Sequence, residues 1–326
     1  MKIERVLFAA AVAIAFAFSP AAAGAQPSAA ASPAAESASL RPFLGRWDLT
    51  VKTPGRERPS WIEVEEQNGQ LSAQFVGAWG HARALPKIEI HGNRISFVSP
   101  KQDEGRKDDM VFEGTLSGKT LSGTTTGPDG TPLTWIGVQA PSLERRSAPQ
   151  WGRPVQLFNG KDLTGWRMIG PETPRWTVEN GELVSPGNGP ELATDTNWGD
   201  FKLHIEFNCG KDSNSGVYLR GRYEVQIETE TQGELLSQHT GAVYGFLAPT
   251  PEHQCTPGAW ETYDITLIGR RVTVVQNGTT VINDKEIPGI TGGALDSHEG
   301  MPGPIYLQGS ENGRVTFRNI VLVPAK

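Results

Sequence analysis

Apolar and polar residues alternate along most of this 326-residue chain. Successive side chains of a β-strand point to opposite faces, so this period of two predicts strands that turn one face toward a core. Turn signals of the Asn-Gly, Gly-Asn and Asp-Gly type separate the alternating runs at short intervals, and helical periodicity is nearly absent. The chain is therefore expected to be all-β.

A break in this pattern divides the chain into two domains. Proline, arginine and serine interrupt the alternation at residues 141–154. The segment before it, residues 40–142, predicts a β-meander of eight strands, at residues 46–52, 61–67, 70–76, 87–90, 94–98, 110–116, 120–125 and 133–138. Strands in series can close into a small barrel, which removes exposed edges. The opening Gly45-Arg46-Trp47 weakly resembles that of lipocalin-like barrels. Four tryptophans of this domain could line a pocket, although core packing is the commoner outcome and is expected here: Trp47, Trp61, Trp79 and Trp135.

The second domain, residues 151–326, contains the most informative alternation. Residues 214–221 and 223–228 alternate so that one sheet face would gather an aromatic ring, a guanidinium, carboxylates and an amide: Tyr218, Arg220, Glu224, Gln226 and Glu228. Such a face suits a sugar, because hydroxyls need dense hydrogen bonding and the C–H face of a sugar ring packs on aromatics. A solvated outer face of an antiparallel sheet would have the same pattern, so both interpretations stay open.

The first residues have the pattern of a secretory signal peptide, residues 1–25. Two basic residues near the start supply positive charge, an apolar run follows at residues 6–18, and Ala23-Gly24-Ala25 is a small-residue cleavage site. The Ala/Ser/Pro-rich residues 26–39 would form a disordered linker. The mature protein is therefore expected to be periplasmic or secreted.

Charge and cysteine content narrow the functional classes. The net charge is -6 and no basic cluster is present, which argues against nucleic-acid binding, because neutralising phosphates takes grouped Lys and Arg. No later apolar run is long enough to span a bilayer, so no membrane insertion is expected after signal removal. The protein contains two cysteines, Cys209 and Cys255, and export would place them in an oxidising compartment. They could form a disulfide or remain two buried free thiols, and the sequence alone leaves both alternatives open.

Ordered motifs along the second domain carry a family resemblance. They read LFNGKDLTGW (157–166), WTVENGEL (176–183), DFKLHIEF (200–207), NSGVYLRGRYEVQIE (214–228), GAVYG (241–245), PGAWETY (257–263), QNG (276–278), GPIYLQ (303–308) and FRNI (317–320). Together they resemble the 3-keto-disaccharide hydrolase family, also known as domain of unknown function 1080, over essentially the whole domain. The resemblance implies a concanavalin A-like jelly-roll sandwich whose concave face holds carbohydrate.

The resemblance also implies an exported glycoside-cleaving enzyme that acts on 3-keto-glycosides or 3-keto-disaccharides. A ketone at C3 acidifies the C2 proton, so a base can remove it, the C1 substituent leaves by elimination, and water adds to the resulting glycal. We assign Glu224 as base or metal ligand, Arg220 as enolate stabiliser and His239 as proton donor. The substrate-binding candidates are Tyr218, Gln226, Tyr244, Gln308 and Asn214. The alternatives are a mere ion pair between Glu224 and Arg220 and a non-catalytic carbohydrate-binding module.

A divalent metal ion would suit the 3-keto oxygen. Oxygen and nitrogen ligands are spread over the second domain, at Glu224, Glu228, Glu230, His239, His253 and His298, without the close spacing of a strong metal motif. One departure from the family bears on the site: many members read Gly-Asp-His after Gln308, where this chain reads Gly309-Ser310-Glu311. Since all family motifs lie in residues 151–326, this domain alone is expected to carry catalysis.

Overall fold

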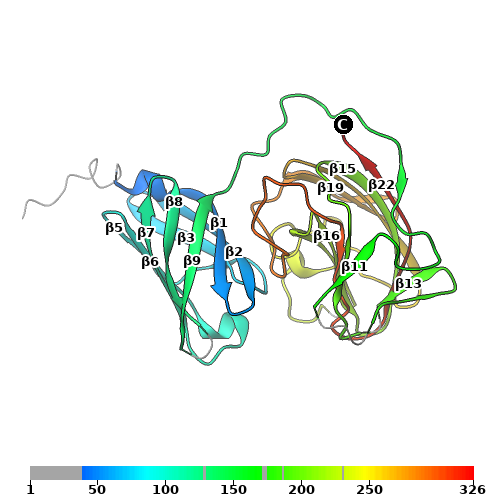
Figure 1. Cartoon of the computed structure of the whole chain (residues 1–326), viewed down its shortest axis with the longest axis horizontal. Helices are drawn as coiled ribbons and strands as arrows, with labels where there is room; N and C mark the ends of the chain where they lie inside the picture. Colours follow the sequence, from blue (N-terminus) through cyan, green and yellow to red (C-terminus); the bar gives the residue numbers. More distant parts are fainter. Residues whose placement is uncertain (1–38, 128–129, 171–174, 186, 230) are drawn as a thin grey trace, which may run out of the picture.

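The computed structural model describes residues 39–326 except 128–129, 171–174, 186 and 230, and these form an almost entirely β protein (Figure 1). The predicted signal peptide and all but the last residue of the predicted linker lie outside the described residues. Helix in the described part is confined to residues 39–40 and three short 3-10 helices, Arg41–Phe43 (η1), Lys101–Glu104 (η2) and Leu236–Gln238 (η3). No helix in this part of the chain is long and apolar enough to cross a membrane. The all-β prediction is confirmed.

The first domain is one nine-stranded antiparallel sheet. Its strands are β1 (Gly45–Thr53), β2 (Arg56–Gln67), β3 (Gln70–Val76), β4 (Arg83–Ala84), β5 (Ile88–His91), β6 (Arg94–Ser99), β7 (Met110–Ser117), β8 (Thr120–Thr126) and β9 (Pro132–Gln139). They lie in the order β4-β3-β2-β1-β9-β8-β7-β6-β5. The first and last strands therefore pair, with Trp47 opposite Gln139. Because β3 also contacts β5, the sheet curls into a barrel-like meander (Figure 1).

All eight strands expected in this domain form, with small differences at their ends. The structure adds the two-residue β4, and β2 starts at Arg56 rather than at Trp61, although Pro59 lies within it. The polar residues before Trp61 pair with β1, where Pro59 is opposite Thr50. A neighbouring strand thus extends the ladder through residues that look like a turn in isolation.

Aromatic side chains fill the core of the curled sheet. Trp47 and Trp135 are buried there. They share the core with three mutually packed phenylalanines, Phe75, Phe97 and Phe112. The other two tryptophans lie elsewhere than expected. Trp61 belongs to the apolar core of the second domain, and Trp79 is 46% exposed.

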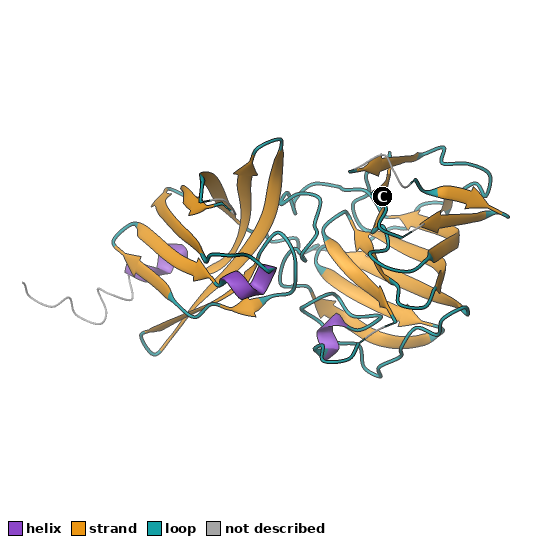
Figure 2. Cartoon of the chain, turned by 90° about the horizontal axis from the view of Figure 1, so that it is seen from below, coloured by secondary structure: helices purple, strands orange, loops and turns teal. Residues whose placement is uncertain are grey.

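The second domain is a sandwich of two antiparallel sheets (Figure 2). The larger sheet has the order β12-β13-β22-β15-β18-β19-β20, with β10 also paired to β22. Its strands are β10 (Val155–Gln156), β12 (Thr177–Glu179), β13 (Glu182–Ser185), β15 (Phe201–Cys209), β18 (Trp260–Ile268), β19 (Arg271–Gln276), β20 (Thr279–Glu286) and β22 (Val315–Pro324). The smaller sheet has the order β11-β14-β21-β16-β17, formed by β11 (Trp166–Ile169), β14 (Glu191–Thr194), β21 (Tyr306–Leu307), β16 (Asn214–Leu219) and β17 (Tyr223–Glu228). Strands β10 and β22 bring the two ends of the domain together, and the jelly-roll prediction is confirmed.

The inner faces of the two sheets pack on each other to form the core. On β15, residues 201, 203, 205 and 207 are apolar and buried, while the residues between them are more exposed. Cys209 at the end of β15 forms a disulfide with Cys255, with a Cα–Cα distance of 6.6 Å. The structure therefore decides between the two alternatives for the cysteines in favour of the disulfide.

The first domain packs directly against the sandwich. Trp61 of β2 meets Phe246 edge-on, with ring centroids 5.3 Å apart. Beside it Asp48 of β1 is buried near Glu299, which Arg270 holds in a 2.6 Å ion pair. Burial, together with the charge of Glu299, raises the pKa of Asp48 to about 9. The two domains thus share an apolar core and a buried cluster of charges.

Candidate functional site

The floor of the candidate site is formed by three cross-strand pairs of β16 and β17. These pairs are Tyr218 with Glu224, Gly216 with Gln226, and Asn214 with Glu228. Because side chains of a strand alternate, all six positions share one face of the sheet, and residues such as Val217 and Val225 face the core. This polar face is not solvated: Glu224 is only 4% exposed and Gln226 only 1%. The interpretation of these strands as a solvated outer face is therefore wrong.

Glu224 is tied to Tyr218 and through it to the backbone. The Tyr218 hydroxyl lies 2.9 Å from Glu224 Oε2 and 2.8 Å from the carbonyl oxygen of Gly292. A hydroxyl carries one proton, so it can donate a hydrogen bond to Gly292 while it accepts one from protonated Glu224, or donate to the ionised Glu224. Burial raises the pKa of Glu224 well above its ordinary value, against the lowering effect of the Tyr218 hydrogen bond. Glu224 is thus a carboxyl that holds its proton unusually long and is a strong base once ionised.

Gly216 makes the space that the Glu224 side chain occupies. A Cβ at residue 216 would lie 2.7 Å from Cγ of Glu224 and closer still to its Oε1. Real Cβ atoms do not approach heavy atoms so closely, so any larger residue would displace the carboxylate. The glycine of the NSG motif is therefore explained by the position of Glu224.

Two segments outside the strand pair form the walls of the site. The segment after β21 runs beside β16, where the backbone N–H of Gln308 donates to Gly216 (3.0 Å) and that of Glu311 donates to Asn214 (2.9 Å). On the other side the backbone N–H of Tyr244 donates to the carbonyl of Glu224 (3.0 Å). These backbone contacts place the side chains at residues 244, 308 and 311 around the Glu224 carboxyl.

The resulting cavity has a volume of about 160 Å³ and collects most of the predicted site residues. It is lined by Glu224 and by all five substrate-binding candidates, Tyr218, Gln226, Tyr244, Gln308 and Asn214. The side-chain carbonyl oxygens of Gln226 and Gln308 are buried and accept no hydrogen bond from a described residue. Buried polar atoms are nearly always paired, so these two oxygens can each accept a hydrogen bond from a ligand.

Sequence reasoning missed four other residues that line this cavity, Trp79, Gly80, Gly292 and Glu311. Glu311 had a signal, because it stands where the resemblance expects a histidine. Trp79 was considered only as a core or pocket residue of the first domain, and Gly80, from the same domain, had no signal. Residues 151–326 were expected to carry the site alone, but the first domain supplies part of the cavity lining.

Arg220 lies away from this cavity. It occupies the turn after β16 with a φ of 54°, so the alternation of the strand ends before it. Its guanidinium donates to the carbonyl of Gly269 (2.6 Å) and lies over the Tyr223 ring, 5.2 Å from the centroid. The ion pair with Glu224 that the sequence left open is not formed, and the geometry does not support an enolate-stabilising role for Arg220.

His239 is also directed elsewhere. Its Nδ1 lies 2.7 Å from Glu252 Oε1, and the residue is 7% exposed. It is not part of the lining of the cavity around Glu224. The structure therefore does not bring together the three predicted catalytic residues, and only Glu224 lies where a substrate could reach it.

Glu228 is a second buried acid on the same strand. Its Oε2 accepts a hydrogen bond from Gln226 Nε2 (2.9 Å), and its Oε1 accepts a longer one from Asn214 Nδ2 (3.4 Å). Burial and the nearby charge of Glu234 raise the pKa of Glu228 to about 8. Gln226 and Asn214 are thereby held in place by an acid behind the cavity.

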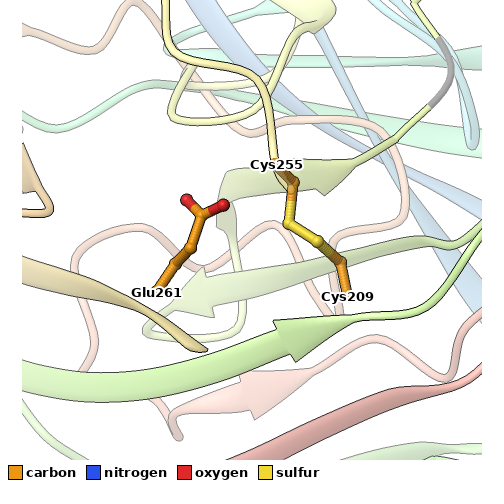
Figure 3. Close-up of side chains that lie close together, drawn as sticks. All are labelled: Cys209, Cys255 and Glu261. Atoms are coloured by element: carbon orange, nitrogen blue, oxygen red, sulfur yellow. A yellow bond between two sulfur atoms is a disulfide. The ribbon is translucent and has the colours of Figure 1, made fainter. Parts of the chain in front are cut away.

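The candidate metal ligands are not clustered in the described part of the chain. His253 pairs with Asn277 (3.0 Å) and His298 with Asp296 (3.5 Å), and Glu230 lies outside the described residues. Within the described residues, the group of metal-type ligand atoms that lies within 4.8 Å is Cys209, Cys255 and Glu261, shown in Figure 3. Two of its three members are joined as a disulfide, so they are not free thiolate ligands. Within the described residues, the candidate ligands considered from the sequence therefore form no such group.

Comparison with known proteins gives one family and several relatives. The profile of the family described as 3-keto-alpha-glucoside-1,2-lyase-like domain matches residues 153–323. A curated protein of Bacteroides thetaiotaomicron named 3-keto-disaccharide hydrolase is 32% identical over 75 residues, 20% of this chain. The match spans only about a quarter of that relative's length, 26%.

Two solved structures from Parabacteroides distasonis, both provisionally named glycosyl hydrolases, are also similar. One is 28% identical with a TM-score of 0.45, and the match covers 52% of this chain and 82% of that one. The other is 23% identical with a TM-score of 0.43, and the match covers 53% of this chain and 94% of that one.

Proposed function

The chain belongs to the family of 3-keto-alpha-glucoside-1,2-lyase-like domains, and from that premise we propose that it is an exported enzyme that cleaves 3-keto-glycosides or 3-keto-disaccharides. The observation that carries the proposal is the buried Glu224 carboxyl, placed with its Tyr218 partner in a small cavity. The unpaired amide oxygens of Gln226 and Gln308 in the same cavity suit the hydroxyl donors of a sugar.

The proposed reaction begins with proton removal at C2. Ionised Glu224 takes the C2 proton, and the electron pair left on C2 forms an enolate with the C3 carbonyl. Collapse of the enolate restores the ketone, forms a C1–C2 double bond and breaks the bond between C1 and the departing oxygen. Water then adds across this double bond, with hydroxyl to C1 and hydrogen to C2, and releases the free 3-keto sugar.

We assign the stabilisation of the enolate to Tyr244. Its hydroxyl accepts a hydrogen bond from Gln238 Nε2 (3.2 Å) and donates its own proton to no described residue. That proton is therefore available to the substrate, where a hydrogen bond to the forming enolate oxygen lowers the barrier. Tyr244 takes the role that the sequence assigned to Arg220.

We assign the protonation of the departing oxygen to Glu311. This carboxyl lines the cavity around Glu224 and also an adjoining cavity of about 470 Å³, so it lies where a leaving group would pass from one to the other. A carboxyl group at that point can pass a proton to the departing oxygen. Glu311 thus replaces His239 as the proposed proton donor.

Turnover is the test of this proposal. Incubation with 3-keto-trehalose or a 3-keto-glucoside should release free 3-keto-glucose, while ordinary disaccharides stay intact because nothing acidifies their C2 proton. Substrate deuterated at C2 should lose its label to solvent. The Glu224→Gln variant should be inactive and remain folded, because the amide keeps the shape but cannot take a proton.

The alternative is a non-catalytic carbohydrate-binding module, since the same cavity could hold a sugar without any chemistry. Wild-type protein that binds the 3-keto sugars but never cleaves them would establish that alternative. Full retention of deuterium in the released sugar would instead exclude the elimination route and point to direct displacement by carboxylates.

Export is part of the proposal. The leader at residues 1–25 and the Cys209–Cys255 disulfide both support an oxidising location outside the cytoplasm. Mass spectrometry of the protein recovered from the periplasm or medium of an expressing bacterium should find an N-terminus near Gln26. An uncleaved chain confined to the cytoplasm would contradict this part of the proposal.

A further inference from the structure

Trp79 of the first domain is an exposed aromatic ring on the lining of the candidate site. It is 46% exposed, whereas the other three tryptophans of that domain are buried. It follows β3 in the loop that leads to β4, and this loop reaches the cavity around Glu224. A tryptophan beside a polar cavity offers a large apolar face on which a ligand in that cavity can pack.

The loop that carries Trp79 is held firmly against the sandwich. The backbone N–H of Gly293 donates to the carbonyl of Ala78 (3.0 Å). At Gly292 a Cβ would lie 2.6 Å from the backbone N of Gly80, so the two chains approach as closely as glycines allow. Arg58 lies over the Trp79 ring, 5.6 Å from its centroid. The ring is thus positioned before any ligand arrives, which reduces the entropy cost of using it.

Trp79 stands between two cavities of different size. It lines the cavity of about 160 Å³ that contains Glu224, and it also lines the adjoining cavity of about 470 Å³. Gln308 and Glu311 are shared by both cavities in the same way, whereas Glu224 belongs only to the smaller one. A ligand with two parts would therefore place one part at Glu224 and the other in the wider cavity, with Trp79 beside the junction.

We propose that Trp79 is a substrate-binding residue for the leaving group: a leaving group with an apolar face, either a second sugar ring or an aromatic aglycone, packs on its indole in the wider cavity. This inference rests on the proposed function, because it takes the 3-keto sugar to occupy the smaller cavity. Sugar C–H faces and aromatic rings both pack favourably on tryptophan, whereas a methyl group covers little of the ring. The first domain thus supplies selectivity for the leaving group to a site whose chemistry lies in the second domain.

The test compares three substrates that share the 3-keto-glucosyl part: 3-keto-trehalose, phenyl 3-keto-glucoside and methyl 3-keto-glucoside. For Trp79→Ala we expect kcat/KM to fall by about 10- to 50-fold on at least one of the first two, as withdrawal of one aromatic face should do. On the methyl glycoside we expect a change below about 3-fold. A loss on only one of the two large substrates identifies which kind of leaving group is bound, and Trp79→Phe should restore part of the activity.

Trp260→Ala is the matched control. That tryptophan is also partly exposed and also lies under an arginine, with Arg318 3.7 Å from its ring centroid, but it is on β18 and outside both cavities. It should leave the order of the three substrates unchanged. Equal losses of Trp79→Ala on all three substrates, or none on any, would overturn the inference.

A failure of the Trp79 inference can be distinguished from a failure of the proposed function. If the wild-type protein cleaves none of the three compounds, the proposed function has failed, and the same compounds are then used as ligands in calorimetry. Weaker binding of 3-keto-trehalose or the phenyl glycoside by Trp79→Ala, with the methyl glycoside unchanged, would still support the packing role. No difference in Kd between wild type and variant would refute it.

Discussion

The space at Gly216 is the sharpest constraint on the site, and Gly216→Ala tests it. The new Cβ would lie 2.7 Å from Glu224 Cγ, about 1 Å inside an ordinary van der Waals contact. The Glu224 carboxyl must therefore move, and with it the 2.9 Å contact with the Tyr218 hydroxyl. Overpacking of this kind costs about 1–3 kcal/mol, and a shift of about 1 Å in a reacting group costs about 100-fold in rate.

Two measurements check this prediction. Thermal unfolding of Gly216→Ala should occur about 2–10 °C below wild type. On a substrate that wild type cleaves, kcat should fall by about 100-fold. Gly199→Ala is the control, because that glycine is exposed, has no heavy atom within 4 Å of its added Cβ and needs no positive φ. It should change neither quantity.

A double-mutant cycle then assigns the cost to Glu224 itself. In a Glu224→Ala background the obstructing side chain is absent, so the additional Gly216→Ala change should cost less than about 0.5 kcal/mol. If Gly216→Ala costs as much in that background as in wild type, the strain comes from the backbone or another neighbour. Glycine at residue 216 would then not be required by the Glu224 carboxyl.

Further predictions concern pH, the leaving group and metals. Ionised Glu224 is the active form and burial raises its pKa, so kcat/KM should rise with pH through a value well above the ordinary glutamate range; Tyr218→Phe removes a bond that lowers this pKa and should move the limb to still higher pH. The pKa of Asp48 is raised from 3.8 to about 9, so its contribution to stability is full below about pH 4 and is lost as pH rises toward 9; in thermal unfolding from pH 4 to 9, Asp48→Asn should show a smaller decline than wild type. Glu311→Gln should slow a methyl 3-keto-glucoside at least about 10-fold more than a 4-nitrophenyl one, whose oxygen leaves without a proton; equal slowing would contradict its role as acid. Dialysis against EDTA should leave turnover unchanged, because the described candidate ligands are not gathered; loss of activity that zinc or calcium restores would overturn this.

Much of the candidate site follows from local alternation. The period of two in residues 214–228 places Tyr218, Glu224 and Gln226 on one face, and the register of β16 with β17 makes the first two direct partners. The motifs that carry the family resemblance also contain Tyr244 and Gln308, and both residues line the cavity. Tyr218, Glu224 and Gln226 were predictable because their placement depends on the strands themselves, whereas Tyr244 and Gln308 lie outside regular strands and were reached through the resemblance.

The roles of Arg220 and His239 could not be predicted in the same way. The left-handed conformation at residue 220 interrupts the alternation. The Arg220 guanidinium therefore donates to the carbonyl of Gly269, which is distant in the sequence. His239 is directed by Glu252, which lies in a loop without periodicity. Where the backbone leaves a regular strand, the direction of a side chain depends on long-range contacts that no local pattern contains.

By itself the sequence determined the all-β character of the chain and the side chains that share the face of Glu224, because both follow from the geometry of one or two strands. Only the tertiary structure decided that this face is buried, that Cys209 and Cys255 are joined, and that Trp79 of the first domain reaches the cavity. A solvated sheet face and a covered one have the same alternation. What distinguishes them is the burial that tertiary packing creates, and this burial raises the pKa of Glu224 by removing water from it.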